Sequence, residues 1–102
     1  MAVQHFSKLT VTNNVPVALA TTNTPAKWIM FQPKTDATGA PTNVGTVWIG
    51  GPGITPTTGG VFLNPGDSIV AWPGGSEYMH DLQQICIVAA NGGDGVQGIY
   101  GA

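Results

Sequence analysis

Glycine and proline interrupt this chain so often that no long regular segment remains between them. The 102 residues include 15 glycines and eight prolines, spread from Pro16 to Gly101. No window of about 11 to 18 residues that lacks both shows apolar side chains at helical spacing. Short runs of β-branched and aromatic residues recur instead, and turn-forming residues bound each run. The sequence therefore predicts an all-β protein.

The apolar runs predict eight strands in a single domain, residues 1–102. The strands are expected at residues 4–11, 15–20, 27–32, 44–49, 60–63, 68–72, 84–90 and 96–100. Pro16 favours an edge position for the second strand, or a place at the strand's start, because proline cannot donate to a ladder. The third strand is apolar on both faces, which predicts a central strand covered on both sides. Eight short strands fit a two-sheet sandwich or a small closed barrel.

Two turn sequences predict hairpins. The segment 64–67, Asn-Pro-Gly-Asp, places proline and glycine where a β-turn favours them, and would join the fifth and sixth strands. We expect Asp67 to accept hydrogen bonds from amides of this turn. The segment 91–95, Asn-Gly-Gly-Asp-Gly, would join the seventh and eighth strands in the same way. Longer loops are expected at 21–26, 33–43, 50–59 and 73–81, the last with room for a helical turn.

The composition excludes several classes of protein. Three lysines and five acidic residues give a net charge of -2, and three scattered lysines cannot form the basic patch that binds nucleic acid. No apolar run approaches the about 18 residues of a membrane span, and residues 1–8 lack the apolar core of a signal peptide. The single Cys86 excludes an intramolecular disulfide, and its apolar neighbours predict a buried, inert thiol.

No motif for catalysis, a cofactor or a metal stands out. The two histidines do not form a His-x-His pair, and no zinc ligand set is present. The glycine-rich segments lack the Lys-Ser or Lys-Thr of a phosphate-binding loop, and no serine lies in a Gly-x-Ser-x-Gly elbow. The carboxylates lie at turns or in loops, where solvated acids are expected: Asp36, Asp67, Glu77, Asp81 and Asp94. We therefore expect a protein that is not an enzyme.

A surface poor in charge and rich in threonine and glycine suits a protein that packs against other subunits. A secreted domain would tolerate the same surface. Trp28, Trp48 and Trp72 fit core packing or, if exposed in a stripe, stacking on sugars or a partner. Among the aromatic segments, Trp72 at a strand end and Tyr78 with Met79 in the next loop are the best candidates for an interface.

A series of turn and strand motifs extends over most of the chain. These motifs are Val-Ala-Leu at 17–19, Thr-Pro-Ala-Lys-Trp-Ile at 24–29, Gly-Thr-Val-Trp-Ile-Gly-Gly at 45–51, Gly-Gly-Val-Phe-Leu-Asn-Pro-Gly-Asp-Ser at 59–68, Asp-Leu at 81–82, Ile85, Asn-Gly-Gly-Asp-Gly-Val at 91–96 and Tyr100. Together they resemble small structural proteins of tailed bacteriophages, above all head decoration (cement) proteins with a jelly-roll or β-sandwich fold.

The resemblance implies a non-enzymatic virion protein on the outer capsid surface, made in the bacterial host cytoplasm. Such a protein bridges major capsid proteins as a dimer or trimer. The N-terminal strand, with Phe6 and Leu9, is then expected to pair with a neighbouring chain's sheet edge, and the loops 33–43 and 50–59 to contact the shell. The alternative is a carbohydrate- or receptor-binding β-sandwich of a phage fibre or a secreted lectin-like domain, which requires at least two tryptophans exposed on one face.

Overall fold

A computed structural model describes residues 3–58, 61–67 and 80–102, together with the backbone of residues 70–72. Within these residues the chain forms ten strands and a 3₁₀ helix: β1 (Val3–Leu9), β2 (Val17–Ala18), β3 (Pro25–Ala26), β4 (Trp28–Pro33), β5 (Val47–Gly50), β6 (Val61–Leu63), β7 (Val70–Trp72), β8 (His80–Asp81), η1 (Leu82–Gln84), β9 (Cys86–Ala89) and β10 (Gly95–Gly101). Eight of the strands correspond to the predicted ones. The pair β3 and β8 has no counterpart among them.

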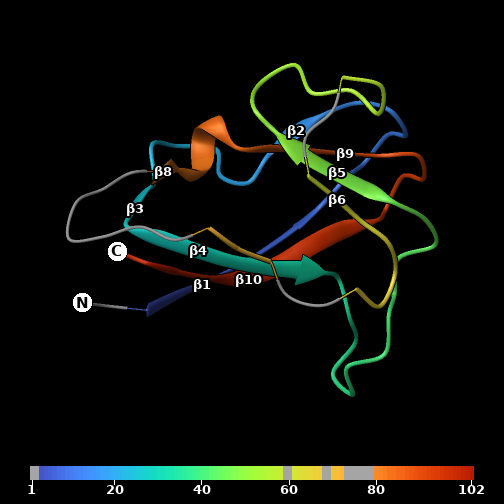
Figure 1. Cartoon of the computed structure of the whole chain (residues 1–102), viewed down its shortest axis with the longest axis horizontal. Coiled ribbons are helices and arrows are strands. Elements are labelled where there is room, and N and C mark those ends of the chain that lie inside the picture. The colour runs from blue at the N-terminus through green and yellow to red at the C-terminus, as the bar shows by residue number, and fades with distance from the viewer. Residues whose placement is uncertain (1–2, 59–60, 68–69, 73–79) are drawn as a thin grey trace.

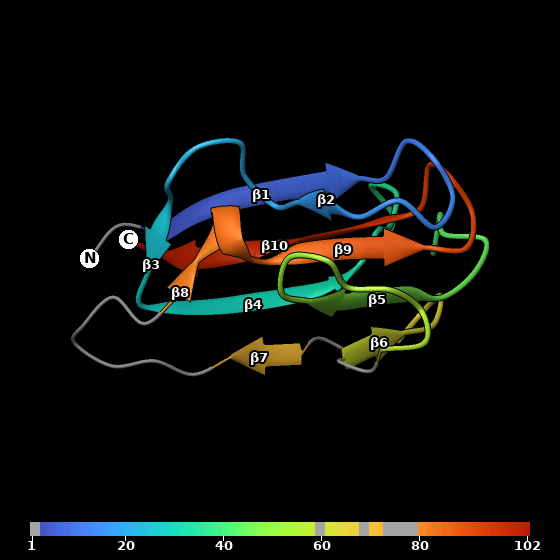
Figure 2. The same ribbon diagram turned by 90° about the horizontal axis from the view of Figure 1, so that it is seen from above.

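The eight main strands form two antiparallel sheets that lie one above the other (Figure 1). The first sheet has the order β1-β10-β4-β7, and the second has the order β2-β9-β5-β6. Viewed from above, β1 and β7 occupy opposite edges of the molecule (Figure 2). The all-β, two-sheet sandwich is confirmed, and so is the edge position of the strand that follows Pro16, because β2 ends its sheet.

Both predicted hairpins are wrong, although both turns form. In the first turn the Asp67 amide donates to the Asn64 carbonyl (3.0 Å), and the Asn64 amide donates to the Asp67 carboxylate (2.6 Å), as expected for Asp67. However, β6 pairs with β5, whereas β7 pairs with β4 in the other sheet. The strands β9 and β10 are separated in the same way. A turn sequence reverses the direction of the chain, but it does not determine which sheet the next strand joins. Pairing within a larger sheet buries more apolar surface than an isolated hairpin does.

The core lies between the sheets and follows the alternation of each strand. On β4, Ile29 and Phe31 point inward and are buried, while Trp28, Met30 and Gln32 are half-exposed on the outer face. The predicted central position of this strand is confirmed, since β10 and β7 flank it. The prediction that it is covered on both sides is wrong, because its outer face stays partly open to solvent.

The second sheet has its own small apolar cluster on the outer face. Ile54, from the loop 51–58, packs there against Cys86 and Val88, and Trp48 adjoins them. Gly50 leaves room for the tip of the Ile54 side chain, which a Cβ at position 50 would displace. Cys86 is buried as predicted, and burial raises the pKa of its thiol. The raised pKa lowers the fraction of reactive thiolate.

Asp81 links the short β3–β8 ribbon to the 3₁₀ helix. Its carboxylate accepts hydrogen bonds from the Thr24 amide (2.9 Å), the Gln83 amide (3.0 Å) and the Asn23 side chain (2.6 Å). The contact with Gln83 caps η1. These hydrogen bonds, led by that from Thr24, hold the pKa of Asp81 below its ordinary value.

Asp81→Asn is expected to lower stability at neutral pH and to have no such effect in strong acid. Because the folded-state pKa of Asp81 lies below its unfolded value, its stabilising contribution is complete above about pH 4 and is lost as the pH falls through the lowered pKa. Urea unfolding of both proteins across this range measures the difference. A stability difference that stays constant from neutral to acid pH would contradict the prediction.

Candidate interaction surfaces

Within the described part of the chain, no three His, Cys, Asp or Glu side chains gather closely enough to hold a metal ion. The same residues include no helix with the length and apolar character that crossing a lipid bilayer requires. The surfaces that remain are an edge strand, a depression on the outer face of the first sheet, and the loops at one end of the sandwich.

β1 is an edge strand, as the sequence predicts for a strand that pairs with another chain. It pairs with β10 over its whole length. Phe6 points toward the core side, where it is half-buried and its ring lies 6.3 Å from that of Tyr100. Leu9 lies on the outer face and keeps 46% of its surface exposed, and Val3 keeps 53%. Of the predicted interface residues, the structure therefore places Phe6 and Leu9 on an open edge, on opposite faces of it.

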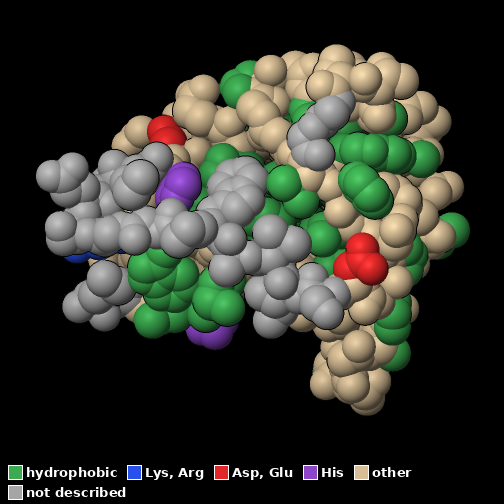
Figure 3. Space-filling view, in the orientation of Figure 1, with side chains coloured by type: hydrophobic (Ala, Val, Ile, Leu, Met, Phe, Trp, Pro, Cys, Tyr) green, Lys and Arg blue, Asp and Glu red, His purple; other side chains and the backbone are tan. Residues whose placement is uncertain are grey.

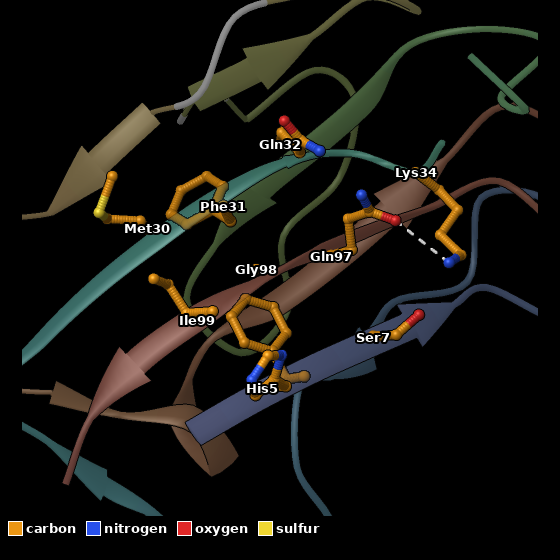
Figure 4. Close-up of a pocket in the computed structure, with 10 residues that line it drawn as sticks. His5, Ser7, Met30, Phe31, Gln32, Lys34, Gln97, Gly98 and Ile99 are labelled. Carbon is orange, nitrogen blue, oxygen red and sulfur yellow. Dashed lines mark hydrogen bonds between the residues drawn. The ribbon is translucent and has the colours of Figure 1, made fainter. Parts of the chain in front are cut away.

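A shallow depression of about 530 Å³ lies on the outer face of the first sheet (Figure 4). Lys34 adds a charged group to its rim. The other side chains that surround it come from β1, β10 and β4: His5, Ser7, Met30, Gln32, Gln97 and Ile99. Gly98 also lines the depression. The Lys34 ammonium donates to the Gln97 side chain (3.1 Å). Hydrophobic side chains gather beneath β4 in the space-filling view (Figure 3), so this face combines apolar surface with few charges.

A buried carboxylate organises the opposite end of the sandwich from the termini. Asp94 is only 3% exposed, and its two carboxylate oxygens accept from the amides of Val44 and Gly45 (both 2.9 Å). The Asp94 carbonyl accepts from the amide and the hydroxyl of Thr10 (2.9 and 2.8 Å). The expectation of a solvated acid is wrong here, because two loops from elsewhere in the chain close over the turn 91–95.

Asn43 completes this arrangement. Its side-chain amide donates to the Gly95 carbonyl, and its oxygen accepts from the Gly95 amide, both at 2.9 Å. The loops 10–15 and 42–46 are thus both fastened to the turn 91–95. Every buried side-chain nitrogen and oxygen in the described residues has a hydrogen-bond partner, so this polar cluster carries no unpaired group.

These fastened loops expose three valines, which we call the valine end: Val11, Val15 and Val44. Val11 is 83% exposed, Val44 is 78% exposed and Val15 is 48% exposed. The loops lie on the right in Figure 1, where the chain leaves β1 and enters β5. The sequence prediction placed Val11 and Val44 within strands, but β1 ends at Leu9 and β5 begins at Val47. The valine end was missed because exposed valines at strand ends look like strand residues.

The predicted loop 33–43 is a protruding structure in its own right. Its tip is closed by the Asp36 amide, which donates to the Ala40 carbonyl (2.9 Å), and by a bridge between Thr35 and Pro41. The Asp36 carboxylate accepts from the hydroxyl and the amide of Thr38 and from the Ala40 amide. These bonds, led by that from the Thr38 hydroxyl, lower the pKa of Asp36. The tip is exposed, as predicted.

The tryptophans bear on the carbohydrate-binding alternative. Trp28 is half-exposed on the outer face of the first sheet, over Gly101. Trp48 is half-exposed on the outer face of the second sheet, beside the Ile54 cluster. The two side chains thus lie on opposite faces of the sandwich and cannot stack on one ligand together.

Three predicted interface residues cannot be placed on these surfaces. The backbone of Trp72 pairs with Ile29, but its side chain lies outside the described part of the structure, as do Tyr78 and Met79 entirely. Comparison of the chain with protein-family models, with curated proteins and with solved structures gives no match.

Proposed function

We propose that this chain is a non-enzymatic structural protein of a tailed-bacteriophage virion: a decoration protein on the outer capsid surface that bridges major capsid subunits as a homo-oligomer. The strand orders β1-β10-β4-β7 and β2-β9-β5-β6 support a jelly roll, which the sequence resemblance implies. Jelly rolls occur in capsid proteins and in lectins. The fold alone therefore does not choose between a capsid role and sugar binding.

The valine end is the observation that carries the proposal. Val11 and Val44 expose most of their surface on loops that Asp94 holds in place. Fixed apolar side chains lose little conformational entropy when a partner covers them, so they favour contact with another protein. A sugar site would instead need aromatic faces and converging polar groups. Valine supplies neither, and the two described tryptophans lie on opposite faces.

The low charge of the chain also supports a permanent contact between the valine end and another protein. Interface centres are depleted in charged residues and surrounded by a polar rim. At the valine end the exposed neighbours are threonine and asparagine, for example Thr12 and Asn13. We propose that this end meets the major capsid protein, and that the exposed tip of the loop 33–43 adds a second contact with the shell.

Quantitative mass spectrometry of purified virus particles tests the role. We expect a copy number equal to that of the major capsid protein or a simple fraction of it. A handful of copies per particle would move the chain to the tail or a fibre, and complete absence would refute a structural role.

A variant then tests the surface. Val44→Asp places a charge on the valine end, and we expect it to abolish binding to capsids that lack the decoration protein while leaving the fold intact. Thr21→Asp, on an exposed loop at the other end of the sandwich, is the matched control and should bind normally. Normal binding by a folded Val44→Asp protein would exclude the valine end as the contact.

A further inference from the structure

β1 carries few of the features that usually protect an edge strand. Natural edges are blunted by proline, bulges, charges or short length. The seven residues of β1, Val-Gln-His-Phe-Ser-Lys-Leu, contain neither proline nor glycine and pair with β10 without a bulge. Lys8 is their single lysine, and it lies on the core-facing side with Phe6, half-buried. The opposite edge of the same sheet is β7, which has only three residues.

The hydrogen bonds show which backbone groups face the open side of β1. The Thr10 amide donates to the Asp94 carbonyl (2.9 Å), and these residues continue the β1–β10 register. Hydrogen-bonded pairs alternate along an antiparallel ladder, so Lys8, Phe6 and Gln4 bond to β10. The amides and carbonyls of the alternate residues therefore point away from β10, toward the open edge: Val3, His5, Ser7 and Leu9.

We propose that this edge binds a second copy of the chain: two β1 strands pair antiparallel across a twofold axis at Phe6, so that two four-stranded sheets become one. The sequence of β1 is self-complementary in this register. Val3 faces Leu9 of the second copy, and both are half-exposed apolar side chains on the outer face. His5 faces Ser7, Gln4 faces Lys8, and Phe6 faces its own copy. Every cross-strand pair thus joins apolar with apolar or polar with polar.

The alternative registers are worse. The backbone pattern also allows shifts in which another residue of β1 sits on the axis. Placing His5 there sets Phe6 against Gln4, and placing Ser7 there sets Phe6 against Lys8. Each shift also shortens the shared ladder. The register centred on Phe6 uses all seven residues and keeps the two Lys8 side chains apart, so charge repulsion does not oppose it.

The dimer does not depend on the proposed capsid role. It is expected of the isolated chain in solution, whereas the capsid contact is assigned to the valine end. A Val44→Asp protein that remains dimeric but does not bind capsids, or a monomeric protein that still binds them, would separate the two proposals.

A proline substitution tests the edge directly. Ser7→Pro removes an amide hydrogen that points to the open side, so the β1–β10 ladder is retained, and proline is tolerated at such edge positions. We expect the unmodified protein and the Ser7→Ala control to sediment as dimers and Ser7→Pro as a monomer with an unchanged circular dichroism spectrum. A monomeric unmodified protein, or a folded Ser7→Pro protein that remains dimeric, would overturn the proposal.

Cysteine cross-linking tests the register, and it decides the matter if Ser7→Pro fails to fold. In the proposed dimer Val3 and Leu9 of the second copy form a hydrogen-bonded pair, with Cα atoms about 5.5 Å apart, a spacing that suits a disulfide. Under mild oxidation, a mixture of Val3→Cys and Leu9→Cys proteins should form covalent dimers, and either protein alone should not. Cys86 is present in both proteins, but because it is buried we do not expect it to contribute to the cross-link. Equal cross-linking by the single proteins and by the mixture would refute this register.

Discussion

Asp94→Ala is expected to destabilise the protein by about 3–5 kcal/mol, because it removes two partly buried, charge-assisted hydrogen bonds that a buried carboxylate accepts. The donors are the amides of Val44 and Gly45, each 2.9 Å from a carboxylate oxygen. A loss of this size is a large part of the total stability of a domain of this length. Urea unfolding followed by tryptophan fluorescence measures it.

Asp36→Ala is the matched control for this prediction. Asp36 also accepts from two backbone amides, those of Thr38 and Ala40, but it lies in an exposed loop where water can replace the carboxylate. We therefore expect a much smaller loss than for Asp94→Ala. Equal losses in the two variants would show that burial of Asp94 is not what makes its hydrogen bonds important.

Gly98→Ala is expected to cost about 2–4 kcal/mol, the range of an overpacked site that cannot relax easily. A Cβ at Gly98 would collide with the Met30 carbonyl oxygen, and would lie 2.9 Å from both the Phe31 Cα and the Phe6 ring. Two of these three neighbours are backbone atoms in a paired strand, so a change of side-chain rotamer cannot relieve the contact. The unfolding midpoint in urea reports the loss.

Gly51→Ala is the matched control for Gly98→Ala. Nothing lies within 4 Å of a Cβ at Gly51, and its φ is not in the left-handed region. Its stability is therefore expected to stay the same or to rise slightly, since alanine reduces the entropy of the unfolded chain. A Gly98→Ala protein as stable as Gly51→Ala would mean that β10 can shift away from β4 and β1 at little cost.

The positions of the strands could be predicted because strand patterns are local. Alternation on β4 and the turn residues at 64–67 and 91–95 are visible in the sequence, and each marks where an element begins or ends. The partner of a strand is not local. β1 pairs with β10 at the other end of the described chain, and nothing in either segment alone specifies that pairing. The short ribbon of β3 and β8 was missed for the same reason, since Asp81 hydrogen-bonds to residues far away in sequence.

The candidate surfaces were predictable only in part. Phe6 and Leu9 belong to a strand whose edge position was expected, and the structure places them there. Val44 was assigned to a strand, because its exposure depends on Asp94, which holds its amide from a distant turn. The sequence shows Asp94 as one more turn residue, and only the packing of two loops over it makes it a buried acid.

The pairing of β1 with β10 has a consequence for how this molecule is made. Nearly every strand neighbours a strand from a remote part of the chain, and β5 with β6 is the one adjacent pair within the eight main strands described. Such topologies fold slowly, because large loops must close before the contacts that stabilise them form. While the ribosome is still synthesising the chain, β1 and β4 must wait for the strand that lies between them. Until β10 emerges, both remain open to pairing with the wrong partner.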